Sequence, residues 1–108
     1  MRLHLLFAAD IQAKARGTAA PHLVSAFSKQ IGSTLDFLTR AHGIEFELLD
    51  SFLYPGHSVH RMHTVAEKMG AALISKLHNA ASVAGATLVC NSHVTQLWVH
   101  EGSDELSG

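Results

Sequence analysis

The chain has 108 residues, 47% of them hydrophobic and 16% charged, which is the composition of one ordinary globular domain and not of a disordered chain. Eight Lys and Arg against nine Asp and Glu give a net charge of -1, and the basic residues are scattered, so a binding surface for nucleic acid or acidic lipid is not expected. No apolar run is long enough to cross a membrane, and the single cysteine, Cys90, allows no intrachain disulfide, so we expect a cytoplasmic protein.

The first half of the chain is predicted to form a strand, a helix and a second strand. Residues 3–9 are almost continuously apolar, which is typical of a strand covered on both faces. Pro21 suits the first turn of a helix whose apolar positions keep helical spacing up to Ala41, and Gly43 provides its stop. Residues 44–48 alternate between apolar and polar side chains, which predicts a half-exposed strand.

The second half is predicted to contain one helix and two further strands. Ser58 is a good N-cap for a helix over residues 58–84, where apolar and small side chains recur at helical spacing. Residues 87–90 and 93–99 are rich in β-forming side chains on either side of an Asn-Ser dipeptide. That dipeptide is compatible with a hairpin turn or with the loop that follows a parallel strand.

This order of elements predicts a single α/β domain over residues 1–100, followed by a flexible polar tail over residues 101–108. Two right-handed crossovers give a small three- to four-stranded, mostly parallel sheet with two main helices. A ferredoxin-like α+β sandwich, with both helices on one face of the sheet, is the alternative. The contrast between an apolar first strand and an alternating second strand favours the first arrangement.

A parallel sheet would place the reactive side chains of the chain at one edge, because ligands bind beyond the carboxyl ends of such strands. Imidazole groups titrate near neutral pH, and a thiol beside an imidazole can become nucleophilic. The candidate catalytic residues at this edge are Asp10, His57, Cys90 and His93. Free backbone N–H groups at a helix start favour an anion. The candidate ligand-binding residues are Gly56, Ser58, Asn91 and Ser92.

Three histidines, His57, His60 and His63, follow one another at intervals of three residues. Imidazoles at this spacing on a helix can share a divalent transition metal such as zinc or nickel. The alternative is that they are solvated side chains at the start of a helix. The sequence therefore identifies a candidate metal site without requiring one.

These patterns lead to one expected function and two alternatives. The expected function is a small ligand-binding or catalytic α/β domain, with a pocket for a small anionic ligand at the C-terminal ends of its strands. The alternatives are a histidine-based metal-binding module and a non-enzymatic oligomeric protein with a regulatory or structural role. Whether the protein is an enzyme stays open. The small residues of the second helix and the exposed edge strand predict a homo-oligomer.

Overall fold

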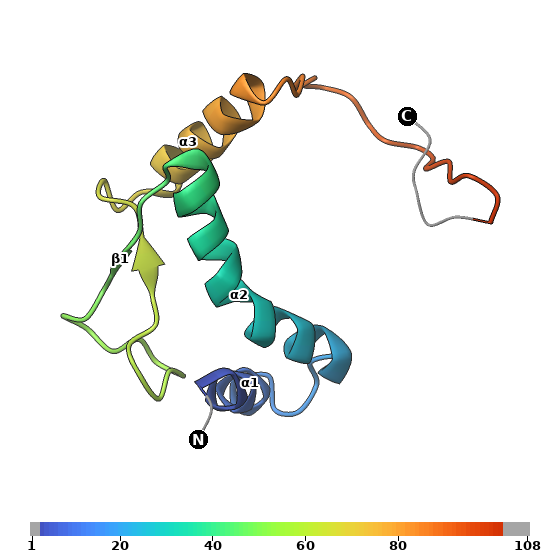
Figure 1. Ribbon diagram of the computed structural model, residues 1–108. Helices are drawn as coiled ribbons and strands as arrows, with labels where there is room; N and C mark the ends of the chain where they lie inside the picture. The colour runs from blue at the N-terminus through green and yellow to red at the C-terminus, as the bar shows by residue number, and fades with distance from the viewer. Residues whose placement is uncertain (1–2, 103–108) are drawn as a thin grey trace.

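Two helices joined by a tight turn form the N-terminal part of the protein (Figure 1). The computed structural model describes residues 3–102, and α1 (Leu3–Lys14) leads into α2 (Pro21–His42). Gly43 ends α2 in the left-handed conformation, with φ of 65°, and its N–H donates to the Thr39 carbonyl at 3.0 Å. The sequence prediction of this helix and of its glycine stop is confirmed.

The prediction of a first strand is wrong, because residues 3–9 belong to α1. α1 as a whole consists largely of Leu, Ala, Gln and Lys, which are strong helix formers, and its one β-branched residue, Ile11, lies outside residues 3–9. Packing agrees with this preference: the Phe7 ring meets the Phe27 ring of α2 edge to face, with the centroids 5.7 Å apart. An apolar run without β-branched residues therefore forms the helix that covers one side of α2.

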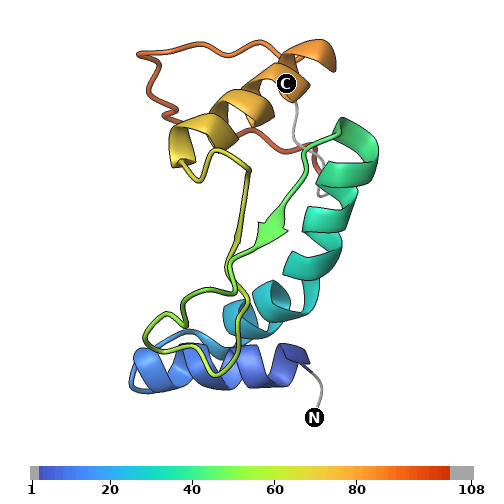
Figure 2. The same ribbon diagram turned by 90° about the vertical axis from the view of Figure 1, so that its left-hand side faces the viewer.

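The second predicted strand is present only as a short fragment. β1 (Glu47–Leu48) pairs antiparallel with β2 (His63–Thr64), so that Glu47 lies opposite Thr64 and Leu48 lies opposite His63. Residues 49–62 form a long connection between these strands and return to α1 (Figure 2). This connection, and not a strand end of a parallel sheet, positions the candidate site.

The second predicted helix begins twelve residues later than expected. Residues 58–69 are not helical, and α3 comprises Gly70–Val83. Before α3 the chain contains β-branched Val59, Thr64 and Val65, whereas α3 is rich in Ala and Leu. Val65, at 1% exposure, is the most deeply buried residue of the described chain. Its burial holds this segment in an extended path.

The predicted strands at 87–90 and 93–99 do not form a sheet with any other described segment. A strand needs a partner for its backbone groups, and residues 87–97 have no backbone hydrogen bond to another described segment. Figure 1 shows this stretch beyond the end of α3 and away from α1. The polar tail predicted from residue 101 lies, from residue 103 onward, outside the described residues.

The fold class is therefore corrected: over residues 3–102 the protein has three helices and a two-stranded antiparallel sheet, without a parallel sheet. The ferredoxin-like sandwich is excluded on the same observation. Within this described range, no helix combines the length and apolar character that a membrane span requires.

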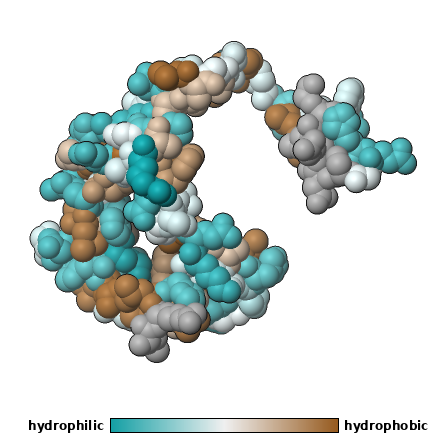
Figure 3. All heavy atoms as spheres, viewed as in Figure 1, coloured by the Kyte–Doolittle hydropathy of each residue, from teal (hydrophilic) through white to brown (hydrophobic). Residues whose placement is uncertain are grey.

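The molecule has an open, C-shaped outline (Figure 3). Its radius of gyration is 17.4 Å, against about 13 Å for a compact chain of this length. Its accessible surface of 8761 Å² compares with about 5,800 Å² for a compact chain of this mass. Among the described residues, the buried apolar side chains are Val24, Ile44 and Val65. Much of the apolar surface consequently faces solvent.

Candidate functional site

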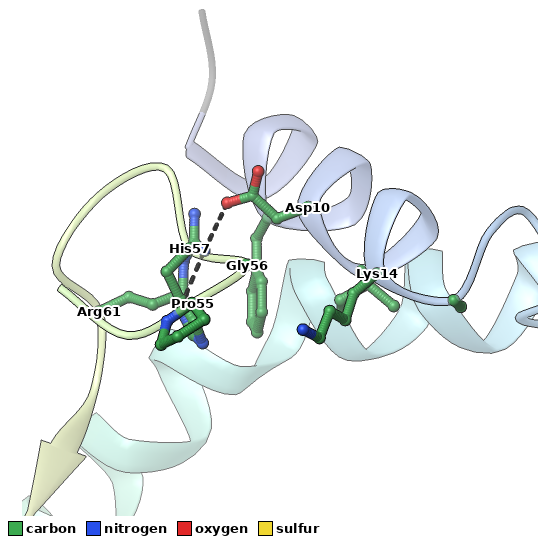
Figure 4. A pocket seen from close by; sticks show the side chains of 9 residues that line it. Asp10, Lys14, Pro55, Gly56, His57 and Arg61 are labelled. Atoms are coloured by element: carbon green, nitrogen blue, oxygen red, sulfur yellow. Dashed lines mark hydrogen bonds and ion pairs between the residues drawn. The ribbon is translucent and has the colours of Figure 1, made fainter.

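A pocket of about 330 Å³ lies between α1 and the connection that follows β1 (Figure 4). α1 contributes residues at positions that share one face of a helix, and the connection contributes a loop from Pro55 to Arg61. The polar side chains that line the pocket are Asp10, Lys14, His57 and Arg61. It combines two permanent cations, one carboxylate and one imidazole.

Asp10 fixes the loop to α1. Its Oδ2 accepts a hydrogen bond from the Ser58 backbone N–H at 2.8 Å, and its Oδ1 accepts one from the Ser58 hydroxyl at 2.6 Å. The Arg61 Nη1 donates to Oδ2 at 2.7 Å and forms an ion pair. The Ser58 hydroxyl and backbone N–H, together with Arg61, lower the pKa of Asp10 to about 2. The carboxylate is therefore ionised at neutral pH, and both of its oxygens are engaged.

Arg61 has one satisfied and one unsatisfied terminal nitrogen. Its Nη1 donates to Asp10 and also approaches the His57 Nδ1 at 3.2 Å, which uses both hydrogens of that nitrogen. Its Nη2 is buried and has no hydrogen-bond partner among the described residues. The guanidinium carbon lies 4.6 Å from the centroid of the Phe7 ring, in a cation–π contact. A charged donor group is thus held in place with part of its hydrogen-bonding capacity unused.

Lys14 places a second positive charge at the pocket. A Cβ added to Gly56 would lie 3.3 Å from the Lys14 Cδ, so the aliphatic stem of Lys14 lies directly over the glycine. Gly56 has φ of +92°, which side chains rarely adopt. Lys14 extends from α1 toward the side on which Pro55 and Arg61 lie (Figure 4), and its ammonium group makes no ion pair within residues 3–102.

His57 takes a defined tautomer in this arrangement. A guanidinium group only donates hydrogen bonds, so the His57 Nδ1 accepts from Arg61 and the ring proton lies on Nε2. In that tautomer the imidazole orients the arginine. His63 behaves differently, because its Nδ1 donates to the Arg61 carbonyl at 2.7 Å.

The structure brings together four of the residues that the sequence identified as candidates. Asp10, Gly56, His57 and Ser58 meet at this pocket or at its anchor. They meet because a helix carries Asp10 to the loop, and not because parallel strands end side by side. The other candidates lie on the exposed segment after α3 and do not line the pocket; they are Cys90, Asn91, Ser92 and His93.

The three spaced histidines occupy a loop and the start of β2, so the helical face on which their sharing of a metal was argued does not exist. His57 faces Arg61, and His63 is engaged with a backbone carbonyl. Across residues 3–102, no three His, Cys, Asp or Glu side chains are grouped so as to hold a metal ion. Whether His57, His60 and His63 bind zinc or nickel after a rearrangement stays a prediction.

The sequence reasoning missed Lys14, Arg61 and Phe7. A helical interpretation of the N-terminal segment would have identified Phe7 and Lys14. Together with Asp10 and Ile11 they stand at positions i, i+3, i+4 and i+7, which share one face of a helix. Arg61 gives no such signal, since its role depends on a contact across 51 residues.

No protein-family model, curated protein sequence or solved structure matches this chain. The geometry of the pocket is therefore the evidence that bears on the function of this protein.

Proposed function

We propose that the protein binds the anionic group of a small molecule in the pocket between α1 and the loop Pro55–Arg61. The observation on which this depends is the Arg61 Nη2, a charged donor that is buried without an acceptor. Leaving a buried polar group unsatisfied costs about 1–3 kcal/mol, and more when the group is charged. A carboxylate or phosphate oxygen supplies the missing acceptor and pairs well with a guanidinium.

The charges at the pocket support an anion over a cation. Lys14 and Arg61 contribute two positive charges, against the one negative charge of Asp10. Asp10 is poorly placed to bind a cation, because both of its carboxylate oxygens already accept hydrogen bonds. The volume of about 330 Å³ lies at the lower end of the range of about 300–1,000 Å³ for small-molecule sites.

The geometry supports binding more than the catalysis expected from the sequence. Of the four candidate catalytic residues, Asp10 and His57 line the pocket, whereas Cys90 and His93 stand outside it. The His57 Nδ1 is occupied by Arg61, so the ring is better placed to orient the guanidinium than to take up a proton from a ligand.

Calorimetric titration with inorganic phosphate and with acetate tests the proposal. We expect millimolar binding that weakens at least about tenfold in Arg61→Gln, because a hydrogen bond to a charged group is worth about 1.5–3 kcal/mol. Arg40→Gln, on the exposed end of α2, makes the same change of charge away from the pocket and should bind as the parent protein does.

A second variant keeps the proposal testable if Arg61→Gln loosens the loop. Lys14 makes no ion pair within the described chain, so Lys14→Gln leaves the fold intact and removes one charge. We expect a several-fold weaker affinity, with Lys29→Gln on α2 as the matched control. Equal affinity in the parent protein, Lys14→Gln and Arg61→Gln, or no binding at tens of millimolar anion, would refute an anion site here.

We also propose self-association of two copies, which a separate observation favours. The accessible surface exceeds that of a compact chain by about 3,000 Å², which is more than the roughly 1,000–2,500 Å² that each subunit of an obligate homodimer buries. Apolar side chains of the segment after α3 are more than half exposed; they include Leu88, Val89, Val94 and Leu97. A second copy of the chain is the partner that offers the same apolar segment in return.

Sedimentation equilibrium at 1 to 100 µM tests this second proposal. We expect a dimer whose dissociation constant rises at least about tenfold in Val94→Ser/Leu97→Ser, because two apolar contacts are lost. Ser substitutions of Leu5 and Leu23, which are exposed on α1 and α2, provide the control. A monomer at every concentration would exclude self-association.

A further inference from the structure

A larger apolar hollow adjoins the anion pocket. This hollow has a volume of about 560 Å³ and lies between α1, α2 and the β1–β2 segment. Its apolar walls come from all three parts and include Leu3 of α1, Ile31 and Leu35 of α2, Leu48 of β1, and Met62. Several of these side chains remain accessible to solvent, Leu3 at 73% and Leu48 at 45%. The fold has thus gathered apolar side chains around a space that it does not fill.

Three residues line both spaces: Phe7, His57 and Arg61. The Arg61 guanidinium rests on the Phe7 ring at 4.6 Å from the centroid, so the cation lies at the boundary between the polar pocket and the apolar hollow. The arrangement places a fixed positive charge, with an unused donor, at one end of an apolar space. This arrangement is complementary to an amphiphile that has an anionic head and an apolar chain.

We infer that the ligand of this site is a single-chain amphiphile with an anionic head, of the fatty-acid type, whose head meets Arg61 and whose alkyl chain lies in the hollow. The inference rests on the proposed anion site and extends it. A small inorganic anion would leave the hollow empty, and a purely apolar molecule would leave the Arg61 Nη2 without an acceptor. An amphiphile satisfies both surfaces at once. The hollow has the size of an ordinary small-molecule site, about 300–1,000 Å³.

The test is a chain-length series of straight-chain carboxylates, from acetate through butanoate and octanoate to dodecanoate, each below its micelle concentration. Each methylene that enters an apolar site tightens binding by up to roughly fourfold. We therefore expect dodecanoate to bind at least about a hundredfold more tightly than butanoate. Dodecanol, which has the chain without the charge, should bind at least about tenfold more weakly than dodecanoate. Dodecyl phosphate should behave as dodecanoate does, since the two heads share one chemistry.

Two variants of the same helix separate the two parts of the ligand. Leu35→Gln places an amide in the hollow and should weaken dodecanoate about tenfold while leaving acetate unchanged. Leu23→Gln makes the same substitution at an exposed position of α2 that lines neither space, and should alter neither ligand. Arg61→Gln should weaken acetate and dodecanoate alike.

The outcomes distinguish this inference from the proposal beneath it. If acetate and phosphate bind through Arg61 but affinity does not rise with chain length, the amphiphile is wrong and the anion site stands. If no anion binds, both fail. The inference would also be overturned if the rise of affinity with chain length were the same in Leu35→Gln and Arg61→Gln as in the parent protein. Binding only to vesicles of anionic phospholipid would overturn it as well. Where a variant does not fold, equal affinity of the parent protein for butanoate and dodecanoate, or for dodecanol and dodecanoate, still refutes the inference.

Discussion

Asp10 and Ser58 are joined twice: the carboxylate accepts one hydrogen bond from the Ser58 backbone N–H at 2.8 Å and another from the Ser58 hydroxyl at 2.6 Å. Forty-eight positions of sequence separate the two residues, so this pair closes the long connection between β1 and β2 onto α1. The Arg61 Nη1 joins the same carboxylate, and the position of the arginine in the pocket depends on it.

Acid should weaken this closure. Because the folded pKa of Asp10 is lowered to about 2 from an ordinary value of 3.8, the carboxylate stabilises the fold fully above about pH 4 and loses that contribution as pH falls to about 2. Asp10→Asn should reduce the decline of the unfolding free energy between pH 4 and pH 2, as measured by urea titration. Glu67, whose pKa is lowered by its own backbone N–H and by Lys76, keeps part of the decline in both proteins.

Asp36→Asn is the matched control for this experiment, because Asp36 is exposed on α2 and lines neither space of the site. It should leave the acid decline as it is in the parent protein. An equal decline in the parent protein and in Asp10→Asn would show that the carboxylate is not held by Ser58 and Arg61 in solution.

Two glycines should respond in opposite directions to replacement by alanine. Gly56 has φ of +92°, and its new Cβ would meet the Lys14 side chain at 3.3 Å, so Gly56→Ala should destabilise the fold by about 1–3 kcal/mol and displace Lys14. Gly32 lies within α2 with open space around it, so Gly32→Ala should stabilise by about 0.5–1 kcal/mol. Thermal unfolding followed by circular dichroism measures both. A stabilising Gly56→Ala would contradict the loop conformation.

The exposed segment after α3 should exchange its amide hydrogens quickly. Residues 87–97 have no backbone hydrogen bond to another described segment, whereas α2 is a continuous hydrogen-bonded helix that includes the buried Val24 and Ser28. At low micromolar concentration, hydrogen exchange followed by mass spectrometry should show rates near those of an unfolded chain over 87–97 and slower exchange in α2. Protection of 87–97 that appears only at higher concentration would support self-association.

The sequence predicted those features that depend on local chemistry. Pro21 and Gly43 mark the ends of α2 because each residue acts on its own backbone, and the structure shows both. Residues 3–9 form a helix although their continuous apolar character predicts a strand, because the segment lacks β-branched residues. The predicted parallel sheet needs this strand as well as those at 87–90 and 93–99, and none of the three is present in the described part of the chain.

In the candidate site, too, the sequence predicts the local features and misses those that depend on contacts between distant residues. Asp10, His57 and Ser58 attract attention as reactive or capping residues, but the sequence does not show that they meet through a helix and a loop. Arg61 depends on Phe7 and Asp10, contacts that neither periodicity nor spacing encodes. Cys90 and His93 were grouped with Asp10 only through the topology, so the correction of the fold removed them from the site.

Val65 should be the residue whose truncation costs the most stability per atom removed. It is 1% exposed, and it lies between β2 and the turn that precedes α3, where its carbonyl accepts from the Lys68 N–H at 2.9 Å. Val65→Ala should lower the unfolding free energy by about 2 kcal/mol, through lost apolar burial and the cavity left behind. Val83→Ala makes the same truncation at a side chain that is 83% exposed and should change stability by less than about 0.5 kcal/mol. Urea unfolding of both variants compares the two positions directly.

Equal losses of unfolding free energy in Val65→Ala and Val83→Ala would mean that the segment from β2 to α3 is not held against the rest of the chain. The wall of the apolar hollow that Met62 forms would then be free to move.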